Sequence, residues 1–284
     1  MSAKKGIDVS EHQGKIDWEK VKPNIDFAII RAGYGKNNID SQFTRNVTEC
    51  QRLSIPFGVY WFSYAYTADM AKAEADYVCN AVAKYNLSYP ICFDFECDSY
   101  NYAIKNGITP NKSLLVSIAK AFLNRVEERG YYTMNYTNID YFNKGFYELV
   151  DRYDIWLANW GVSNPTKRCG IWQYSSTGFV AGITGNVDLD YAFNDYPSII
   201  KNMNDNTNSN NENDEYVLSS KDKEVILEKL GEDWLNKYIN IATDIIAGVY
   251  GNGEERKKSI SNKGFDYDIA QTIVNYILRR DTNE

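Results

Sequence analysis

Apolar and polar positions alternate in two ways over the first two-thirds of the chain. Short apolar runs rich in aromatic and β-branched residues predict strands at residues 6–9, 27–32, 57–62, 89–96, 132–136, 154–158, 170–174 and 187–190. Residues 69–83 and 112–129 have the helical spacing of apolar side chains, and we expect Thr67 and Thr109 to cap these two helices. This repetition predicts an α/β fold with parallel strands, either a barrel or an open sheet. Because the late strands follow one another without helices, the pattern favours an irregular (β/α) barrel of the TIM-like type.

The pattern changes after Asp195. Seven of the twelve residues from Asn202 to Asn213 are asparagine, and this stretch lacks any apolar periodicity. We therefore expect a catalytic domain at residues 1–196, a flexible linker at 197–215 and a second domain at 216–284. Apolar spacing in the last part predicts a small all-α helical bundle, with helices at residues 221–230, 232–247, 254–261 and 266–278.

Composition excludes several classes of function. The 284 residues have a formal net charge of −7, which disfavours nucleic acid and anionic membrane as partners. Since His12 is the only histidine and the five cysteines form no C-x-x-C pair, we expect no metal and no cofactor, although an all-carboxylate metal site stays open. No secretory signal precedes the first predicted strand, so we expect synthesis in the cytoplasm.

The sharpest chemical signal is the segment ICFDFEC at residues 91–97. Side chains alternate along a strand, so Asp94 and Glu96 share one face, about 6–7 Å apart along the strand. Two acids buried together raise the pKa of one of them, and a neutral acid beside a carboxylate is typical of glycosidic bond cleavage. Further acids are expected at the same barrel mouth, because Asp8 ends the first strand and Asp188 and Asp190 lie in the last one.

Seven ordered segments resemble those of the glycoside hydrolase family 25 lysozymes, the muramidases common among phage endolysins. They read GIDVSEHQGKIDW, FAIIRAGYG, PFGVYWF, CFDFE, IWLANWG, IWQYSSTG and GNVDLD, and they span residues 5–191. The resemblance implies an irregular (β/α) barrel that cleaves the β-1,4 bond between N-acetylmuramic acid and N-acetylglucosamine in peptidoglycan.

The resemblance also implies roles for single residues. Glu96 matches the family's general acid. Asp94 matches its partner acid, which either stabilises an oxazolinium formed by the substrate's own 2-acetamido group or acts more directly. Asp8 and Asp188 match the other two acids of the groove. Positions near the substrate are matched by Tyr60, Tyr136, Gln173, Arg31 and Trp160. Trp61 stands where the family often has histidine, and strand alternation predicts that it points outward.

Residues 241–278 resemble a second module, the Cpl-7-like cell-wall-binding repeat. The informative pieces are AGVYGNGEER, GFDYD and the spacing Q-x-x-VN. Only one copy is present, and tyrosine replaces the family's tryptophan at the glycine turn. The resemblance makes Tyr250 and Arg256 the residues expected to contact muropeptide.

Together these features predict a modular peptidoglycan hydrolase, a phage or prophage endolysin that acts on the wall after release. Two alternatives stay open at this point, a chitinase-like glycosidase and a catalytically inactive wall-binding protein. Met203 lies inside the expected linker, so a C-terminal fragment started there is a further possible partner of the full chain.

Overall fold

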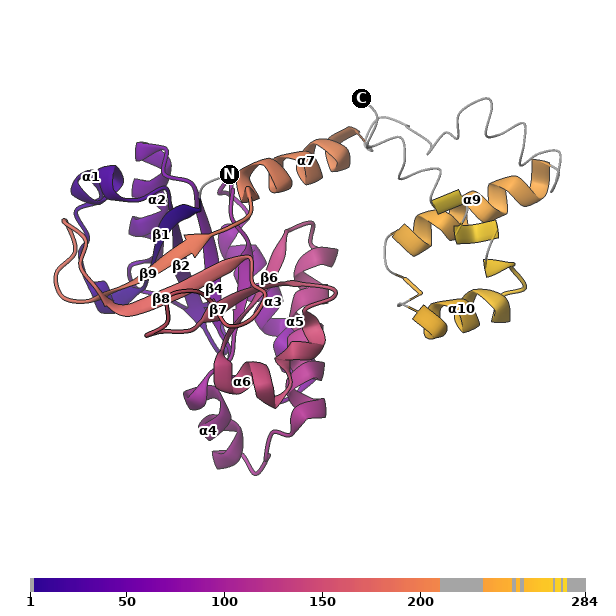
Figure 1. Cartoon of the computed structure of the whole chain (residues 1–284), viewed down its shortest axis with the longest axis horizontal. Helices are drawn as coiled ribbons and strands as arrows, with labels where there is room; N and C mark the ends of the chain where they lie inside the picture. The colour runs from indigo at the N-terminus through magenta and orange to yellow at the C-terminus, as the bar shows by residue number, and fades with distance from the viewer. Residues whose placement is uncertain are drawn as a thin grey trace. The chain divides into compact units, whose positions relative to one another are not determined.

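The computed structural model describes residues 3–209, 232–246, 249–250, 253–267, 269–271 and 273–274 (Figure 1). The chain divides into two compact units, Met1–Asn204 and Asp205–Glu284. Within the described residues, every helix is too short or too polar to cross a membrane.

The first unit is a closed barrel of eight strands. These are β1 (Lys4–Val9), β2 (Phe27–Tyr34), β4 (Phe57–Phe62), β5 (Ile91–Asp94), β6 (Thr133–Asn138), β7 (Asp154–Ala158), β8 (Ile171–Gly178) and β9 (Val187–Ala192). Their order is β1-β9-β8-β7-β6-β5-β4-β2, and pairing of β1 with β2 closes the ring. β9 runs antiparallel to both neighbours, whereas the other barrel pairs are parallel. The predicted irregular barrel is confirmed.

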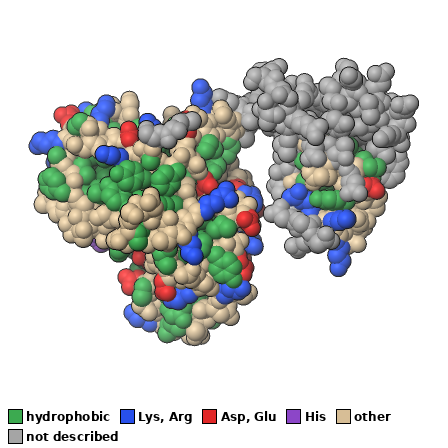
Figure 2. Space-filling view, viewed as in Figure 1, with side chains coloured by type: hydrophobic (Ala, Val, Ile, Leu, Met, Phe, Trp, Pro, Cys, Tyr) green, Lys and Arg blue, Asp and Glu red, His purple; other side chains and the backbone are tan. Residues whose placement is uncertain are grey.

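Short helices surround this barrel. They are α1 (Trp18–Val21), α2 (Phe43–Leu53), α3 (Ala68–Val82), α4 (Cys97–Lys105), α5 (Lys112–Glu128), α6 (Ile139–Lys144) and α7 (Tyr196–Ser209), with 3-10 turns η1 (Glu11–Gln13), η2 (Lys22–Asn24) and η3 (Phe146–Leu149); the short strand β3 (Asn38–Ile39) pairs with β2. Figure 2 shows hydrophobic side chains gathered on the face over β8 and β9, which follow β7 without an intervening helix.

Two of the expected helices occur close to their predicted bounds, and one cap differs. The Thr67 side chain accepts a hydrogen bond from the Met70 N–H at 3.2 Å, as expected for the start of α3. α5 is capped by Asn111, whose side chain accepts from the Leu114 N–H at 2.9 Å, so the expectation for Thr109 was wrong. Asn111 stands directly before the first helical residue, where a cap must lie.

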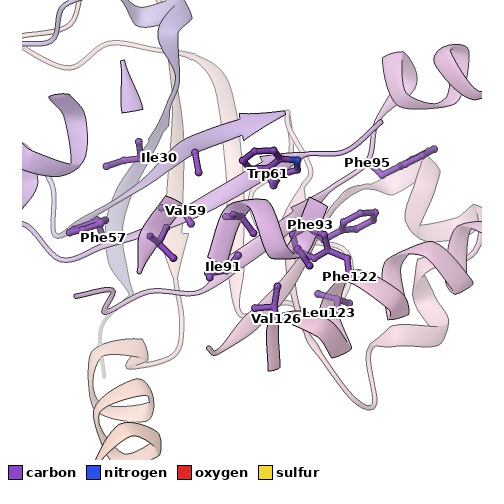
Figure 3. Close-up of a cluster of buried hydrophobic side chains, with 14 of the residues drawn as sticks. Ile30, Phe57, Val59, Trp61, Ile91, Phe93, Phe95, Phe122, Leu123 and Val126 are labelled. Carbon is purple, nitrogen blue, oxygen red and sulfur yellow. The ribbon is translucent and has the colours of Figure 1, made fainter. Parts of the chain in front are cut away.

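Strand alternation sorts the side chains into two cores. Outward-facing residues of β2, β4 and β5 form one outer core under the helices, as Figure 3 shows for Ile30, Val59, Trp61, Ile91 and Phe93. Phe93 packs against Phe122 of α5, and Trp61 packs against Tyr77 of α3. Trp61 is fully buried in this outer core and its indole N–H donates to the Gly35 carbonyl at 3.2 Å. The prediction that Trp61 points outward is therefore confirmed.

The inner core fills the lower part of the barrel, where the parallel strands begin. Its buried members include Phe27, Ile29, Cys92, Met134 and Ile171, together with Tyr196 and Ile200 of α7. The Tyr196 hydroxyl donates to Asp154 Oδ2 at 2.9 Å, at the first residue of β7. The segment expected to start a flexible linker is thus helical from residue 196 to 209, because two apolar side chains one turn apart seat it under the barrel.

The second unit is helical in its described residues. It contains α9 (Glu232–Ile246), α10 (Gly253–Asn262) and further helical residues at 267, 269–271 and 273–274. Its buried side chains are Tyr238, Ile241, Ala242, Ile245, Tyr250, Ile260, Ala270, Ile273 and Val274. The helix predicted at 221–230 lies outside the described residues.

Candidate active site

Acidic side chains gather inside the barrel where the parallel strands end. Asp94 is the last residue of β5, and Asp8 of β1 pairs in register with Asp188 of β9. Asp190 lies two residues further along β9 and faces the same interior as Asp8. Asp8, Asp94 and Asp190 expose only 6%, 4% and 0% of their surfaces. These acids therefore meet in one desolvated layer, at the end where α/β barrels build active sites.

Asp94 and Glu96 form a hydrogen-bonded pair of acids. β5 ends at Asp94, and Glu96 is the residue that begins α4, with its backbone N–H donating to Ser99 Oγ at 3.0 Å. The prediction that both acids lie on one strand was therefore wrong, because the start of α4 interrupts the strand. The two side chains still meet, since the chain turns directly beyond the barrel mouth.

Burial governs the protonation of this pair. Burial raises the pKa of Asp94 well above its usual range, and the nearby Glu96 charge raises it further, whereas Arg31 lowers it. Burial also raises the pKa of Glu96, which is half-buried. A hydrogen bond from Tyr136 lowers the Glu96 pKa, and the Asp188 charge raises it. The arrangement favours one shared proton over two negative charges.

A second acidic cluster lies across the barrel and is organised by Gln173 of β8. The Gln173 amide donates to Asp8 Oδ2 at 2.7 Å. Burial raises the pKa of Asp8, and the charges of Asp190 and Asp188 add to that rise. Burial likewise raises the pKa of Asp188 to about 6 and that of Asp190 to about 8.

Sequence reasoning expected Asp190 at the barrel mouth but gave it no role in the site. Its Oδ1 accepts a hydrogen bond from the Trp156 indole at 2.8 Å, and its carboxyl group also shares a hydrogen bond with Asp8. The signal was present in the spacing D-x-D, which puts Asp188 and Asp190 on one face of β9. Asp190 lies two residues beyond Asp188 on β9 and its charge raises the pKa of Asp8, so it belongs to the charge balance of the site.

Aromatic side chains line the interior beside the acids. The Trp156 ring packs edge-on against Tyr136 at 4.7 Å and against Tyr60 at 6.0 Å between ring centres. The Tyr136 hydroxyl, which also bonds Glu96, lies 3.3 Å from Gln173 Oε1, and the indole of Trp160 donates to the same Gln173 oxygen at 3.2 Å. Trp160 is 52% exposed, so it offers an open ring face at the rim.

Arg31 is brought close to the acids but is held by other partners. Its Nε donates to Asp40 Oδ2 at 2.8 Å and its Nη2 donates to Glu11 Oε1 at 2.8 Å. A third nitrogen lies 3.4 Å from His12 Nε2. The guanidinium therefore acts on the site as a fixed, buried positive charge that lowers the pKa of Asp94.

The two residues expected to bind wall lie in the second unit. The Tyr250 ring is 6% exposed, its hydroxyl donates to Asp244 Oδ2 at 3.0 Å, and the Lys263 ammonium lies 5.0 Å from the ring centre. Tyr250 thus packs in the helical core, and its contact with muropeptide stays a prediction. Arg256 of α10 is half-buried, and its role stays a prediction.

Comparison with known proteins places both units in families. The sequence matches the glycosyl hydrolases family 25 over residues 7–183 and the CW_7 repeat over residues 240–278. It is 31% identical to lysozyme M1 of Streptomyces globisporus over 199 residues, which are 66% of this chain and 67% of that protein. It is 25% identical to the lysozyme of Streptococcus phage Cp-7 over 284 residues, covering 95% of this chain and 69% of that protein.

Solved structures agree with the barrel. The bacterial lysozyme from Streptomyces coelicolor superposes with a TM-score of 0.60 at 28% identity, covering 72% of this chain and 99% of that one. The modular autolysin LytC from Streptococcus pneumoniae, in complex with synthetic peptidoglycan ligand, gives a TM-score of 0.59 at 30% identity and covers 67% of this chain and 47% of that one. The chain spans 55% of the autolytic lysozyme of Clostridium acetobutylicum. Because the family match covers more than half of the sequence, this chain belongs to the glycosyl hydrolases of family 25.

Proposed function

We propose that this chain is a peptidoglycan muramidase, a lysozyme that hydrolyses the β-1,4 bond between N-acetylmuramic acid and N-acetylglucosamine, with Glu96 as its general acid. The observation that carries the proposal is the hydrogen-bonded pair of Asp94 and Glu96 at the open end of the barrel. Glu96 is the more exposed of the two, so it is the acid within reach of a bound glycan. Burial raises its pKa, which favours the protonated form that a general acid needs.

The proposed reaction follows from this placement. The Glu96 carboxyl donates its proton to the glycosidic oxygen as the bond to the anomeric carbon breaks. Positive charge then develops on the sugar, and either Asp94 or the substrate's 2-acetamido oxygen, held by Asp94, stabilises it. Water finally attacks the anomeric carbon and returns its proton to Glu96. Asp188, at the mouth of the same acidic layer, adds negative potential where the positive charge forms.

Gln173 supports this site from the opposite wall. One amide group joins Asp8, Tyr136 and Trp160 by hydrogen bonds. It therefore fixes the distance across the groove while leaving the Trp160 ring free to stack on a pyranose face. On this proposal, Tyr60 and Tyr136 form the aromatic wall beneath the cleaved sugar.

The second unit is proposed to hold the enzyme on the wall, as the CW_7 repeat and the alignment with the phage lysozyme over both units suggest. On this proposal the enzyme is a phage or prophage endolysin, made in the host cytoplasm and released at lysis. A chain ending at Asn204 should keep its turnover on soluble muropeptides. On whole walls it should lose activity mainly at low enzyme concentration, because tethering raises the local substrate concentration.

A C-terminal fragment started at Met203 stays a proposal. The activity of the CTP1L endolysin is described as regulated by a secondary translation product. Met203 lies in α7 of this chain, ahead of the whole CW_7 repeat. Expression of a Met203→Ile gene should abolish any short product seen on a gel, and persistence of that product would exclude Met203 as its start.

The decisive test of the proposed function uses purified walls and identifies the new reducing ends. N-acetylmuramic acid at those ends supports a muramidase, whereas cleavage of chitin oligomers alone supports a chitinase-like enzyme. Glu96→Gln serves as the matched control and should lose 10²–10⁴ in rate with an unchanged circular dichroism spectrum. Full turnover by Glu96→Gln would overturn the assignment, and an inactive wild type that still binds walls would favour a binding protein.

A further inference from the structure

A tyrosine-lined pocket lies beside the acid pair and takes no part in the chemistry proposed above. It has a volume of about 350 Å³. Its walls are formed mainly by aromatic and apolar side chains, with one cation at the edge: Tyr64, Tyr66, Tyr77, Tyr102, Met70 and Lys36. Tyr102 is 41% exposed and Tyr64 and Tyr66 are half-buried, so ring surface is open to a ligand.

Both walls of this tyrosine pocket continue from the strands that carry the active site. Tyr64 and Tyr66 follow β4 directly, and the N–H of Ser63, the residue after β4, donates to the Asp94 carbonyl at 2.7 Å. Tyr102 comes from α4, the helix that begins just after Glu96. The pocket therefore opens at the same end of the barrel as the acid pair.

The pocket is held in shape from behind. Glu74 of α3 is 3% exposed, accepts from the Tyr64 N–H at 2.9 Å and accepts a second hydrogen bond from the Ser63 hydroxyl. This buried carboxyl fixes the turn that presents the Tyr64 ring. On the other wall, Tyr102 lies 5.0 Å from Tyr64 and 6.2 Å from Tyr66 between ring centres, with the rings inclined to each other by 60° and 41°. The three rings form an aromatic corner on a fixed turn.

We infer that this tyrosine pocket is a distal subsite that binds an N-acetylhexosamine ring of the glycan strand, beyond the two sugars at the cleaved bond. Inclined aromatic faces match the apolar faces of a pyranose, and tyrosine hydroxyls can bond its hydroxyl groups. The inference rests on the proposed function, since it requires a glycan strand in the groove. Its consequence is a preference for long strands that depends on these three rings.

The test measures cleavage by the full chain on peptide-free glycan oligomers of increasing length. Tyr102→Ala and Tyr66→Ala should each raise KM about 3- to 10-fold on long oligomers, from the usual strength of one aromatic contact. Both variants should match wild type on the shortest cleaved oligomer and should shift the cleavage position along an end-labelled long oligomer. Tyr102→Phe should behave like wild type, since it keeps the ring.

Phe193→Ala is the matched control, because Phe193 is 44% exposed and follows β9 at the opposite end of the barrel. It should leave KM and the cleavage position unchanged at every length. Equal KM values for Tyr102→Ala and wild type on all oligomers would overturn the subsite while leaving the muramidase intact. A loss confined to peptide-bearing substrates would also overturn it, and would assign the pocket to the stem peptide. Failure of the proposed function is distinct, since wild type would then cleave no oligomer.

Discussion

The lower and upper halves of the barrel interior are built from the same strands but hold opposite kinds of side chain. The lower half is apolar, with Phe27, Met134 and Ile171 closed from below by Tyr196 of α7. The upper half is occupied by buried acids and the groups that bond them. Stability and chemistry are therefore separated along the barrel axis: the apolar half and the outer core hold the ring, and the acidic half weakens it.

In the acidic half, the fold disfavours ionisation of the buried carboxyl groups. Burial raises the pKa of every acid in the layer: Asp8, Asp94, Glu96, Asp188 and Asp190. The one cation shown to oppose this at the acid pair is Arg31. Removing an upper-half acid should thus impair catalysis and spare or improve stability, whereas trimming the lower half should do the reverse.

The largest expected effect is on catalysis. Asp94→Asn keeps the size of the side chain but removes the charge that would stabilise the sugar, so kcat should fall by about 10²–10⁴. The free energy of unfolding should stay equal or rise, because the substitution removes one of two buried acids that disfavour each other's ionisation. Wall clearing and urea unfolding of the same preparation measure both. If Asp94→Asn is inactive only because its urea midpoint has fallen so far that it is unfolded in the assay, then the acidic half also contributes to stability and the two roles are not separate.

The next effect should fall on stability alone. Tyr196→Ala empties a fully buried site under the barrel and should cost about 3–5 kcal/mol. Tyr196→Phe keeps the ring and loses the hydrogen bond to Asp154 and the one accepted from Asn194, so it should cost about 1–2 kcal/mol. Both should retain turnover at 25 °C, measured on soluble muropeptides. Loss of kcat in a folded Tyr196→Ala protein would show that the lower half shapes the acids after all.

A smaller effect concerns pH. Because Asp190 holds its proton up to about pH 8 in the fold and only to about pH 4 when unfolded, unfolding releases a proton between these values. The free energy of unfolding should therefore fall as pH rises across that window, by up to about 1.4 kcal/mol per unit for one group. Asp190→Asn keeps an oxygen for the Trp156 indole and should flatten the decline. Thermal midpoints at pH 5 and pH 8 decide this, and parallel curves for both proteins would refute it.

Much of this division was predictable from sequence, and the limits have physical causes. Alternation in ICFDFEC correctly put Phe93 outside and Cys92 inside, because a buried strand leaves each side chain only two directions. It could not show that the strand stops at Asp94, since strand and helix start compete for the same residues there. Nor could asparagine-rich composition show the helix α7, whose position depends on Tyr196 finding a cavity built by strands far away in the chain.

Long-range partners were the other limit. That Gln173 joins Asp8, and that Arg31 is held by Asp40 and Glu11, depends on which strands become neighbours when the ring closes. The family resemblance indicated the acids but not the bonds among them. Tyr250 illustrates the same point in the second unit. The Lys263 ammonium lies over its ring, and the sequence of the glycine turn around Tyr250 does not indicate this contact.

The smallest expected effect tests whether a buried acid outside the barrel behaves differently. Burial raises the pKa of Glu74 to about 7, while hydrogen bonds from Ser63 and Tyr64 lower it. The folded protein therefore keeps this proton longer than the unfolded chain, and ionisation of Glu74 destabilises the fold progressively from about pH 4.5 to pH 7. Glu74→Gln loses one acceptor, which should cost about 1 kcal/mol at pH 5. At pH 8 that deficit should shrink or reverse, since the variant has no charge to bury. Urea midpoints of the two proteins at pH 5 and pH 8 measure this change in their relative stability.

Since Ser63 and Tyr64 keep their places on β4 and its turn, the kcat of Glu74→Gln should differ from that of wild type by less than about tenfold, equal to about 1.4 kcal/mol. A larger fall in kcat would mean that this acid positions Asp94 through Ser63, and the division of roles would then extend beyond the barrel wall.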